Sequence, residues 1–592
     1  MRGVRAGLTI LGAIAALALA QRPAPPMRNG VITGQIVDAA TGRPVNGVVV
    51  ALKPQPQRIL TAADGRFVFT ELPAGPYTIV GTRRGYVEGA SGRRRPGGTS
   101  QPVTLSVDER SADVVVRMWK TAVITGVVTD ESGDPVVGAQ LRALERSTVA
   151  GQSRFTAAGA PAFTDDRGVY RFSDLAPGEY LVATIAPRPA MTRSVYRTVA
   201  TEPRGGNVRT IAIPDPAKAL QIGGVLYGLG RGAVTPPPPR ADRVRMYPPT
   251  FYPSAPTPVE AGTVVARSGA ERAGVDIQLQ PANTVRVAGT LIGPLGAAPT
   301  TTVQLLPAGF EVLAVDDAAL SAVTDDFGRF VFPAVPEGEY TLRASARVGT
   351  GNPSTQSMQF AATQISASAE SVEVVALLQP GLTVNGRFDF IGRDRKPVKG
   401  GSPVVLEPAD GDPVPIPSMR STSTDTTFTI SGVPPGRYLV RATASPAGWM
   451  FRSATFGGAD VSDTPIDVTQ DTAGVTITFI DRWSGLSGVT RAADGLGDPA
   501  ATVLLFPANA SAWKDYGSNP RRLRSARTSP RGEFAIASVP PGEYYVVAIP
   551  ESQSRDWAHP ARLNGLASLG THVTILEGEH RTVDLQTHDL RQ

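Results

Sequence analysis

The sequence contains no cysteine among its 592 residues. This absence excludes disulfide bonds, cysteine-ligated zinc, thiol nucleophiles and a lipid anchor attached to cysteine. A secreted chain of this kind must therefore be held together by its hydrophobic cores, which domains of about 100 residues can do.

Histidine is almost as scarce, with four residues that all lie near the C-terminus: His559, His572, His580 and His588. A zinc carboxypeptidase centre needs histidines and a glutamate around one metal, with a further glutamate as base. His572 and His580 flank a strand-like segment without a His-x-x-Glu pair, and no Gly-x-Ser-x-Gly elbow is present. We therefore expect no catalytic residue, no metal site and no cofactor, and interpret the histidines as ordinary residues of the C-terminal region.

Charged residues make up only 19% of the chain, and six of them are lysines. The lysines occupy no common position in the sequence, which disfavours Lys–Asn isopeptide crosslinks. The net charge is +6, with the arginines scattered except for Arg93, Arg94 and Arg95. Such a cluster is typical of a solvated loop, so we expect no nucleic-acid partner.

The first twenty residues have the order of a secretory signal peptide. Arg2 and Arg5 precede an apolar run over 8–19, and an A-x-A site predicts cleavage after about Ala20. A proline-rich lead follows over 21–29. No later stretch is apolar enough over a sufficient length to span a bilayer. The mature chain is therefore expected to be secreted or periplasmic. Association with the outer membrane stays open.

One motif recurs five times, first as D-G-R-F-V-F-T-E-L-P-A-G-P-Y over 64–77. The step from its first aromatic residue to the final tyrosine is the same in every copy: 67 to 77, 170 to 180, 330 to 340, 428 to 438 and 534 to 544. A turn glycine and alternating aromatics predict a strand, which the Pro-x-Gly segment ends. A tyrosine just after that turn resembles a tyrosine corner, with a buried ring and a hydroxyl bonded to backbone. The predicted structural corners are Tyr77, Tyr180, Tyr340, Tyr438 and Tyr544.

A second block, G-x-V-x-D followed by G-x-P-V-x-G-A, precedes the first two copies and recurs more weakly before the others. Two blocks in constant order, with 62 glycines and 53 prolines, predict an all-β chain of about five tandem β-sandwiches. The expected segments are a signal peptide 1–20, the lead 21–29 and domains 30–119, 120–284, 285–380, 381–481 and 482–592.

The second predicted domain contains a long proline-rich insert over 188–262. Because proline cannot occupy a central strand, we expect a loop or polyproline segment laid over that domain. Its aromatics Tyr247, Phe251 and Tyr252 suggest a surface for sugar stacking or peptide docking. The alternative is that these rings fasten the insert to its own domain.

The two blocks, clearest at 31–80 and 121–182, resemble the carboxypeptidase regulatory-like domain. That resemblance implies a transthyretin-like Greek-key sandwich of about seven strands, found in tandem in secreted bacterial proteins. In the fourth copy Thr426 stands where the other copies have the turn glycine. The resemblance is specific for fold and implies little about activity.

These observations favour a non-catalytic protein with a structural, adhesive or protein-interaction role at the cell envelope, where its partner would be an envelope protein or a glycan. One alternative is a carbohydrate-binding protein that stacks sugars on exposed aromatic rings, with Trp449, Trp483, Trp513 and Trp557 as further candidates. The other is an accessory component of an outer-membrane transporter system. Solvent-facing rings would favour sugar binding, and buried rings would favour the structural role.

Overall fold

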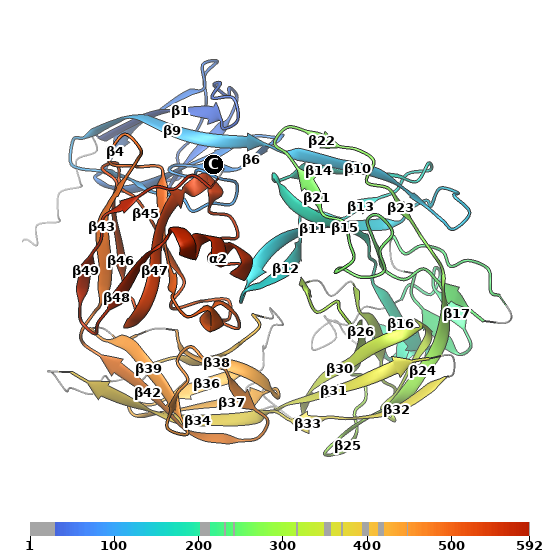
Figure 1. Ribbon diagram of the computed structural model, residues 1–592. Coiled ribbons are helices and arrows are strands. Elements are labelled where there is room, and N and C mark those ends of the chain that lie inside the picture. The colour runs from blue at the N-terminus through green and yellow to red at the C-terminus, as the bar shows by residue number, and fades with distance from the viewer. Residues whose placement is uncertain are drawn as a thin grey trace, which may run out of the picture. The chain divides into compact units, whose positions relative to one another are not determined.

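The computed structural model confirms the predicted all-β class (Figure 1). The predicted signal peptide and proline-rich lead lie outside the residues that the structure describes. The described residues are 30–201, 214–229, 232–240, 243–314, 318–348, 357–368, 371–392, 402–411, 419–443, 445–446 and 448–590.

Successive strands pair into two sheets around each corner tyrosine, and we number the sandwiches first to fifth by the tyrosine they contain. In every sandwich the strand of the first block is central to one sheet. In the first sandwich, β1 (Gly30–Asp38) pairs antiparallel with β4 (Arg66–Leu72) and parallel with β9 (Arg110–Lys120). Alternating burial along such strands places one face in the core, as the period of two requires.

Other strands of the first sandwich form its second sheet, and the second sandwich has two sheets of its own. The first sandwich adds β2 (Val49–Lys53), β3 (Arg58–Leu60), β5 (Gly75–Thr82), β7 (Gly89–Ala90) and β8 (Val103–Leu105). The second consists of β10 (Ala122–Thr129), β11 (Gln140–Val149), β12 (Gln152–Ala157), β13 (Ala162–Phe163), β14 (Val169–Leu175), β15 (Gly178–Thr184), β20 (Thr250–Phe251), β21 (Val264–Ala266), β22 (Glu271–Arg272) and β23 (Ile277–Gln278).

The last three sandwiches repeat this arrangement, with a larger second sheet in the third. The third contains β19 (Arg245–Met246), β24 (Ala282–Gly293), β25 (Gly296–Ala297), β26 (Thr302–Pro307), β28 (Leu320–Val323), β29 (Arg329–Pro336), β30 (Gly338–Val348), β31 (Ser357–Ala367), β32 (Val372–Leu377) and β33 (Gln379–Pro380). The fourth contains β34 (Leu382–Ile391), β35 (Val404–Pro408), β36 (Arg420–Ser423), β37 (Thr427–Val433), β38 (Gly436–Ala442), β39 (Met450–Phe456), β40 (Ala459–Asp460), β41 (Ile466–Val468) and β42 (Thr472–Ile480). The fifth contains β43 (Gly485–Arg491), β44 (Ala501–Pro507), β45 (Arg524–Arg527), β46 (Glu533–Ala537), β47 (Gly542–Pro550), β48 (Thr571–Ile575), β49 (His580–Thr582) and β50 (Leu585–Gln586).

The proline-rich insert contributes strands to the third sandwich, so the expectation of a loop laid over the second one is wrong for this part. Strand β16 (Arg188–Thr192) pairs parallel with β28 and antiparallel with β18 (Val225–Tyr227), which pairs with β17 (Leu220–Ile222). These strands extend the sheet that runs through β28, β26, β30 and β31 (Figure 1). The short helix α1 (Arg193–Thr201) follows β16 directly.

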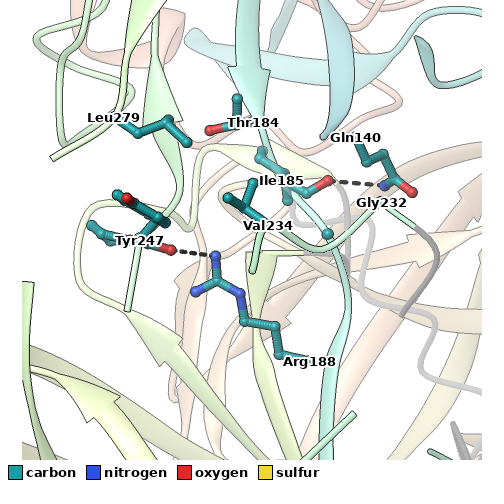
Figure 2. Close-up of a pocket in the computed structure, with 10 residues that line it drawn as sticks. Gln140, Thr184, Ile185, Arg188, Gly232, Val234, Tyr247 and Leu279 are labelled. Atoms are coloured by element: carbon teal, nitrogen blue, oxygen red, sulfur yellow. Dashed lines mark hydrogen bonds between the residues drawn. The ribbon is translucent and has the colours of Figure 1, made fainter. Parts of the chain in front are cut away.

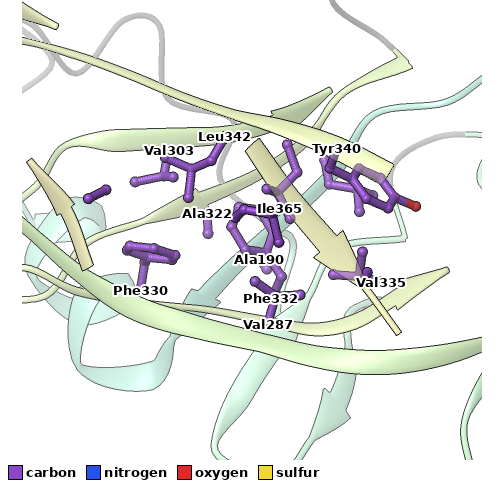
Figure 3. Close-up of a cluster of buried hydrophobic side chains, with 14 of the residues drawn as sticks. Ala190, Val287, Val303, Ala322, Phe330, Phe332, Val335, Tyr340, Leu342 and Ile365 are labelled. Carbon is purple, nitrogen blue, oxygen red and sulfur yellow. The ribbon is translucent and has the colours of Figure 1, made fainter. Parts of the chain in front are cut away.

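The core of the third sandwich is therefore built from two distant parts of the sequence. Ala190 and Tyr227 of the insert lie in one buried cluster with Phe330, Phe332 and Tyr340 of the repeated motif. Figure 3 shows Ala190 among these side chains, with Tyr340 at one end of the cluster. The insert is rich in proline, but the Ala, Val, Leu and Tyr residues between its prolines supply the apolar surface that is buried here.

The chain divides into two compact units. One comprises residues 1–84, 88–93 and 97–118, and the other comprises 85–87, 94–96 and 119–592. The second to fifth sandwiches thus belong to one unit. The five predicted domain boundaries stay a prediction.

Candidate functional site

The five repeated tyrosines share one geometry. Each hydroxyl donates a hydrogen bond to the carbonyl oxygen four residues earlier, over 2.6 to 2.9 Å. Each ring is at most 5% exposed. The pairs are Tyr77 with Pro73, Tyr180 with Ala176, Tyr340 with Pro336, Tyr438 with Pro434 and Tyr544 with Pro540. The ring fills the core and the hydroxyl satisfies a turn carbonyl, which leaves no face of these rings for a ligand.

The burial of these rings changes their acidity. Desolvation raises the pKa of Tyr438 and of Tyr544 to about 12, and it raises the pKa of Tyr180 and Tyr340 as well. For Tyr544 the nearby Arg522 guanidinium acts in the opposite direction and lowers the pKa. All of these hydroxyls are therefore protonated donors at neutral pH.

A glycine of the first block occupies one position in every sandwich. A Cβ atom there would lie 1.9 to 2.4 Å from the carbonyl oxygen of a valine, closer than atoms can approach. This valine lies in the last strand of the sandwich or, in the second and fifth sandwiches, between its two short last strands. The five positions are Gly34, Gly126, Gly289, Gly386 and Gly488. Only glycine permits this close packing of the first and last strands.

The aromatics of the insert do not form the ligand surface that the sequence suggested. Phe251 is fully buried and packs edge-on against Phe310 of the third sandwich, with ring centroids 5.6 Å apart. Tyr247 is 7% exposed, and its hydroxyl donates to Glu131 over 2.6 Å. Tyr252 is half-buried against the core of the second sandwich. The rings fasten the insert, because burial in the two sandwiches supplies more apolar contact than a solvent-facing position.

A small pocket lies where the insert meets the second sandwich (Figure 2). It is lined by Gln140, Ile185, Arg188, Tyr247 and Leu279 among others, and its volume of about 10 Å³ has room for a single water molecule. Arg188 donates to the carbonyl of Tyr247, and Gln140 donates to the carbonyl of Ile185 over 2.9 Å. These hydrogen bonds join residues of the pocket lining to one another. A volume of about 10 Å³ is too small for a sugar ring.

The tryptophans proposed for sugar stacking are mostly used in packing. Trp449 packs edge-on against Phe390 in the fourth sandwich, and the indole of Trp513 donates to the carbonyl of Pro507 over 2.9 Å. Trp557 is half-buried beside the core of the fifth sandwich. Trp483, at 44% exposure, is the most open of the four. Trp513 and Trp557 both pack against Phe506 in one hydrophobic cluster, so these two rings serve the core of the fifth sandwich.

The four histidines lie at different places in the fifth sandwich. His559 caps the N-terminus of α2 (Pro560–Leu569), where its side chain accepts a hydrogen bond from the Ala561 amide. His572 packs edge-on against Tyr545, while His580 lies on β49 and His588 lies after β50. Within the described residues no three histidine or acidic side chains come together as a metal site would require.

A buried ionic cluster joins the fourth sandwich to the fifth, and nothing in the sequence pointed to it. Arg441 and Glu407, both 7% exposed, pair over 3.3 Å on neighbouring strands of the fourth sandwich. The second oxygen of Glu407 accepts hydrogen bonds from the amides of Ser518 and Asn519, over 2.7 and 2.9 Å, in a loop of the fifth sandwich. Arg441 also donates to the Tyr516 carbonyl of that loop over 3.3 Å.

The same loop contributes two arginines to Asp463 of the fourth sandwich. Arg522 pairs with Asp463 over 2.6 Å, and Arg521 pairs with it over 3.5 Å and stacks on the Phe451 ring at 4.3 Å. Burial alone would raise the pKa of Asp463, but the charges of Arg521, Arg522 and Arg441 outweigh it and hold that pKa below its usual value. Burial lowers the pKa of Arg521 to about 10, which still leaves it charged at neutral pH.

This ionic cluster is suited to holding two sandwiches together and is unsuited to catalysis. Its carboxylates already accept hydrogen bonds or ion pairs from the chain. Its guanidinium groups stay protonated at neutral pH and cannot act as a base. A sequence signal was absent because Arg521-Arg522 is indistinguishable from a solvated loop pair, and because Glu407 is a single acidic residue in a strand.

Comparisons with known proteins find one family model and several solved structures. The family model of the carboxypeptidase regulatory-like domain matches residues 31–118 and 123–212. Solved structures with similar folds include the Bacillus anthracis TIE protein, at 11% identity and TM-score 0.13, with 73% of this chain and 66% of that chain covered. A search of the curated proteins finds no match.

Two pilins are also similar in fold. The minor pilin GBS52 of Streptococcus agalactiae is 14% identical, with TM-score 0.19 and coverage of 42% of this chain and 95% of that chain. The major pilin RrgB of Streptococcus pneumoniae is 8% identical, with TM-score 0.14 and coverage of 95% and 99%. Identities and TM-scores this low carry no inference about what this chain does.

The fold places the chain in a class. It is an all-β protein of tandem β-sandwiches. More particularly, its first two sandwiches are matched by the model of the carboxypeptidase regulatory-like domain, over 31–118 and 123–212. In the part of the chain that the structure describes, no helix has the length and apolar character needed to cross a membrane.

Proposed function

We propose that this chain is a non-catalytic structural or adhesive protein of the cell envelope, secreted or exported to the periplasm. One observation carries the proposal: the aromatic rings of the insert and the buried charged side chains make their contacts within the chain. Phe251 joins the insert to the third sandwich, and the Glu407–Arg441 pair joins the fourth to the fifth. A protein organised in this way is suited to keeping its second to fifth sandwiches in fixed relation.

The family supports the non-catalytic part of the proposal, because the matched model describes a regulatory-like domain and not a catalytic one. The test is an activity assay of purified residues 21–592 on peptide substrates, with added zinc and with a chelator. We expect no turnover in either condition. Zinc-dependent turnover that the chelator abolishes would overturn the proposal.

The envelope role is tested by chemical crosslinking in the cells that produce the protein. We expect the chain in the envelope fraction, crosslinked to a defined envelope protein through an exposed sandwich surface. A glycan array with the purified chain provides the opposing arm. Selective binding to one glycan, competed by the free sugar, would replace the structural role with carbohydrate binding.

A further inference from the structure

The hairpin of β11 and β12 has no equal in the first sandwich. Strand β11 has ten residues, whereas its counterpart β2 has five. The extra half of β11 pairs with β12 from Leu144–Ala157 to Val149–Gln152. Ala150 and Gly151 form the tip with positive φ angles of 52° and 78°. The hairpin therefore continues beyond the sandwich that it starts in.

The third and fourth sandwiches bind one side of this hairpin, and a single arginine contacts both of them. The side chain of Arg154 on β12 is only 5% exposed. Its guanidinium donates to the carbonyl of Glu311 in the third sandwich, and to both the carbonyl and the carboxylate of Asp410 in the fourth, over 3.0 and 3.1 Å. Next to it, the Phe155 amide donates to the Val312 carbonyl over 2.9 Å, where β12 pairs with β27 (Leu313–Ala314).

The tip and the base of the hairpin are bound by the fifth sandwich. The Asp515 amide donates to the Ala150 carbonyl over 3.0 Å. A Cβ atom at Gly151 would lie 2.3 Å from the Trp513 carbonyl, so the two backbones are in close contact. On β11, Glu145 pairs with Arg555, which also donates to the Pro177 carbonyl over 2.9 Å.

We propose that the β11–β12 hairpin couples the second sandwich to the third, fourth and fifth, and that Arg154 is the positioning residue of this coupling. Its Nη1 and Nη2 atoms keep the acceptors described above only while the loops of Glu311 and Asp410 are both in place, and its buried Nε has no hydrogen-bond partner among the described residues. If either loop leaves, a buried cation loses its acceptors, which is costly. Release of one loop is thereby disfavoured as long as the other stays, so the sandwiches move together. The inference does not depend on the envelope role.

Hydrogen exchange measured by mass spectrometry on the full chain tests the coupling, because backbone amides report on each contact. In Arg154→Ala, peptides that contain the Phe155 and Asp515 amides should exchange faster by about tenfold to a hundredfold, the factor expected for the loss of one or two charge-assisted hydrogen bonds. The cores around Tyr180, Tyr340 and Tyr438 should keep their protection. Unchanged exchange at Phe155 and Asp515 would overturn the proposal.

Arg146→Ala is the matched control. Arg146 lies on the same hairpin, but its side chain bonds Ser153 and Glu179, both in the second sandwich. This variant should leave the exchange at Phe155 and Asp515 as in the unmodified chain. Equal acceleration in both variants would mean that any damage to the hairpin releases the contacts and that Arg154 has no special part.

Arg154→Lys keeps the test decisive if the alanine variant does not fold. A lysine keeps the positive charge but lacks the planar fork that reaches two acceptors on different loops. We expect faster exchange at Phe155 or at Asp515, while the sandwich cores stay protected. Exchange identical to that of the unmodified chain would show that charge alone suffices and would refute the coupling role of the fork.

Discussion

The corner motif and the β11–β12 hairpin differ in the range of their contacts along the sequence. The corner is written five times, and each copy closes on itself, since the tyrosine hydroxyl bonds a carbonyl only four residues away. The hairpin is written once, and its main contacts reach residues such as Asp410, more than two hundred positions further on. The repeated motif supplies residues to the core of each sandwich, whereas the unrepeated hairpin joins one sandwich to others.

The difference teaches where change should be tolerated. A defect in a corner removes apolar volume from one core and should stay local. A defect in the hairpin or in the Glu407–Arg441 cluster leaves cores intact and should alter how sandwiches associate. The predictions below separate these two kinds of damage, beginning with the largest expected effect.

Tyr180→Ala should destabilise the second sandwich by about 3 to 5 kcal/mol, because it empties a ring-sized space in a packed core. Native-state hydrogen exchange of the β14 and β15 amides measures this free energy. Tyr180→Phe is the matched control, since it keeps the ring and loses only the bond to Ala176, at about 1 kcal/mol. Equal costs for the two variants would contradict a role in packing.

Arg441→Ala should cost about 3 to 5 kcal/mol at the junction of the fourth and fifth sandwiches, because Glu407 stays buried without its cation. The measurement is exchange of the Gly517 amide, which bonds the Ala409 carbonyl across that junction. Arg437→Ala, on the same strand, is the control: its 58% exposed side chain pairs at the surface and should contribute under about 1 kcal/mol. An Arg441 variant as stable as the control would show that the cluster is dispensable.

How far the sequence predicts this structure follows the same division. The all-β class and the two regulatory-like domains were predictable, because the Gly, Phe, Pro-x-Gly and Tyr positions act over about fourteen residues. The strand β16 was not, because its partner β28 is some 130 residues away and its prolines disfavour an internal strand. For the same reason the sequence left open whether Phe251 forms a ligand surface or fastens the insert, because periodicity distinguishes buried from exposed rings only inside a regular strand.

The ionic cluster was equally unpredictable. The local sequence does not distinguish buried arginines such as Arg154 and Arg441 from exposed ones, because their acceptors are distant in the sequence. Charged residues are usually exposed, but at the contacts between sandwiches some of them are buried and paired. A single sequence therefore describes the sandwiches better than the joints between them.

Alkaline pH should destabilise the cores together, because the corner occurs in all of them. The folded pKa of Tyr438 and Tyr544 is about 12, above the unfolded value of about 10. The stabilisation from the protonated hydroxyls is complete below about pH 10 and is lost as the pH rises through about 12. Tyrosinate absorbance and circular dichroism, followed together, should change together in that window. Ionisation of all thirteen tyrosines near pH 10 with the fold intact would contradict the shared corner.

The smallest effect is expected at the turn where the fourth copy departs from the others. Gly168 has a φ of +73°, and a Cβ there would lie 2.6 Å from the Val128 carbonyl, whereas Thr426 is absent from the residues with positive φ. Instead the Thr424 hydroxyl accepts from the Thr426 and Thr427 amides, over 3.3 and 3.0 Å. Both turns still present the same acceptor: Gly168 to the Val128 amide over 2.9 Å, and Thr426 to the Phe388 amide over 2.9 Å.

Thr426→Gly should therefore lower the stability of the fourth sandwich, by up to about 1 kcal/mol, through the greater entropy of glycine in the unfolded chain. Exchange of the β37 and β38 amides measures the change. Restoring the repeated residue would be stabilising only if Thr426 were strained, so a gain in protection would mean that the fourth turn is a damaged copy of the motif. A loss would mean that a threonine turn replaced the glycine turn while keeping its one long-range bond.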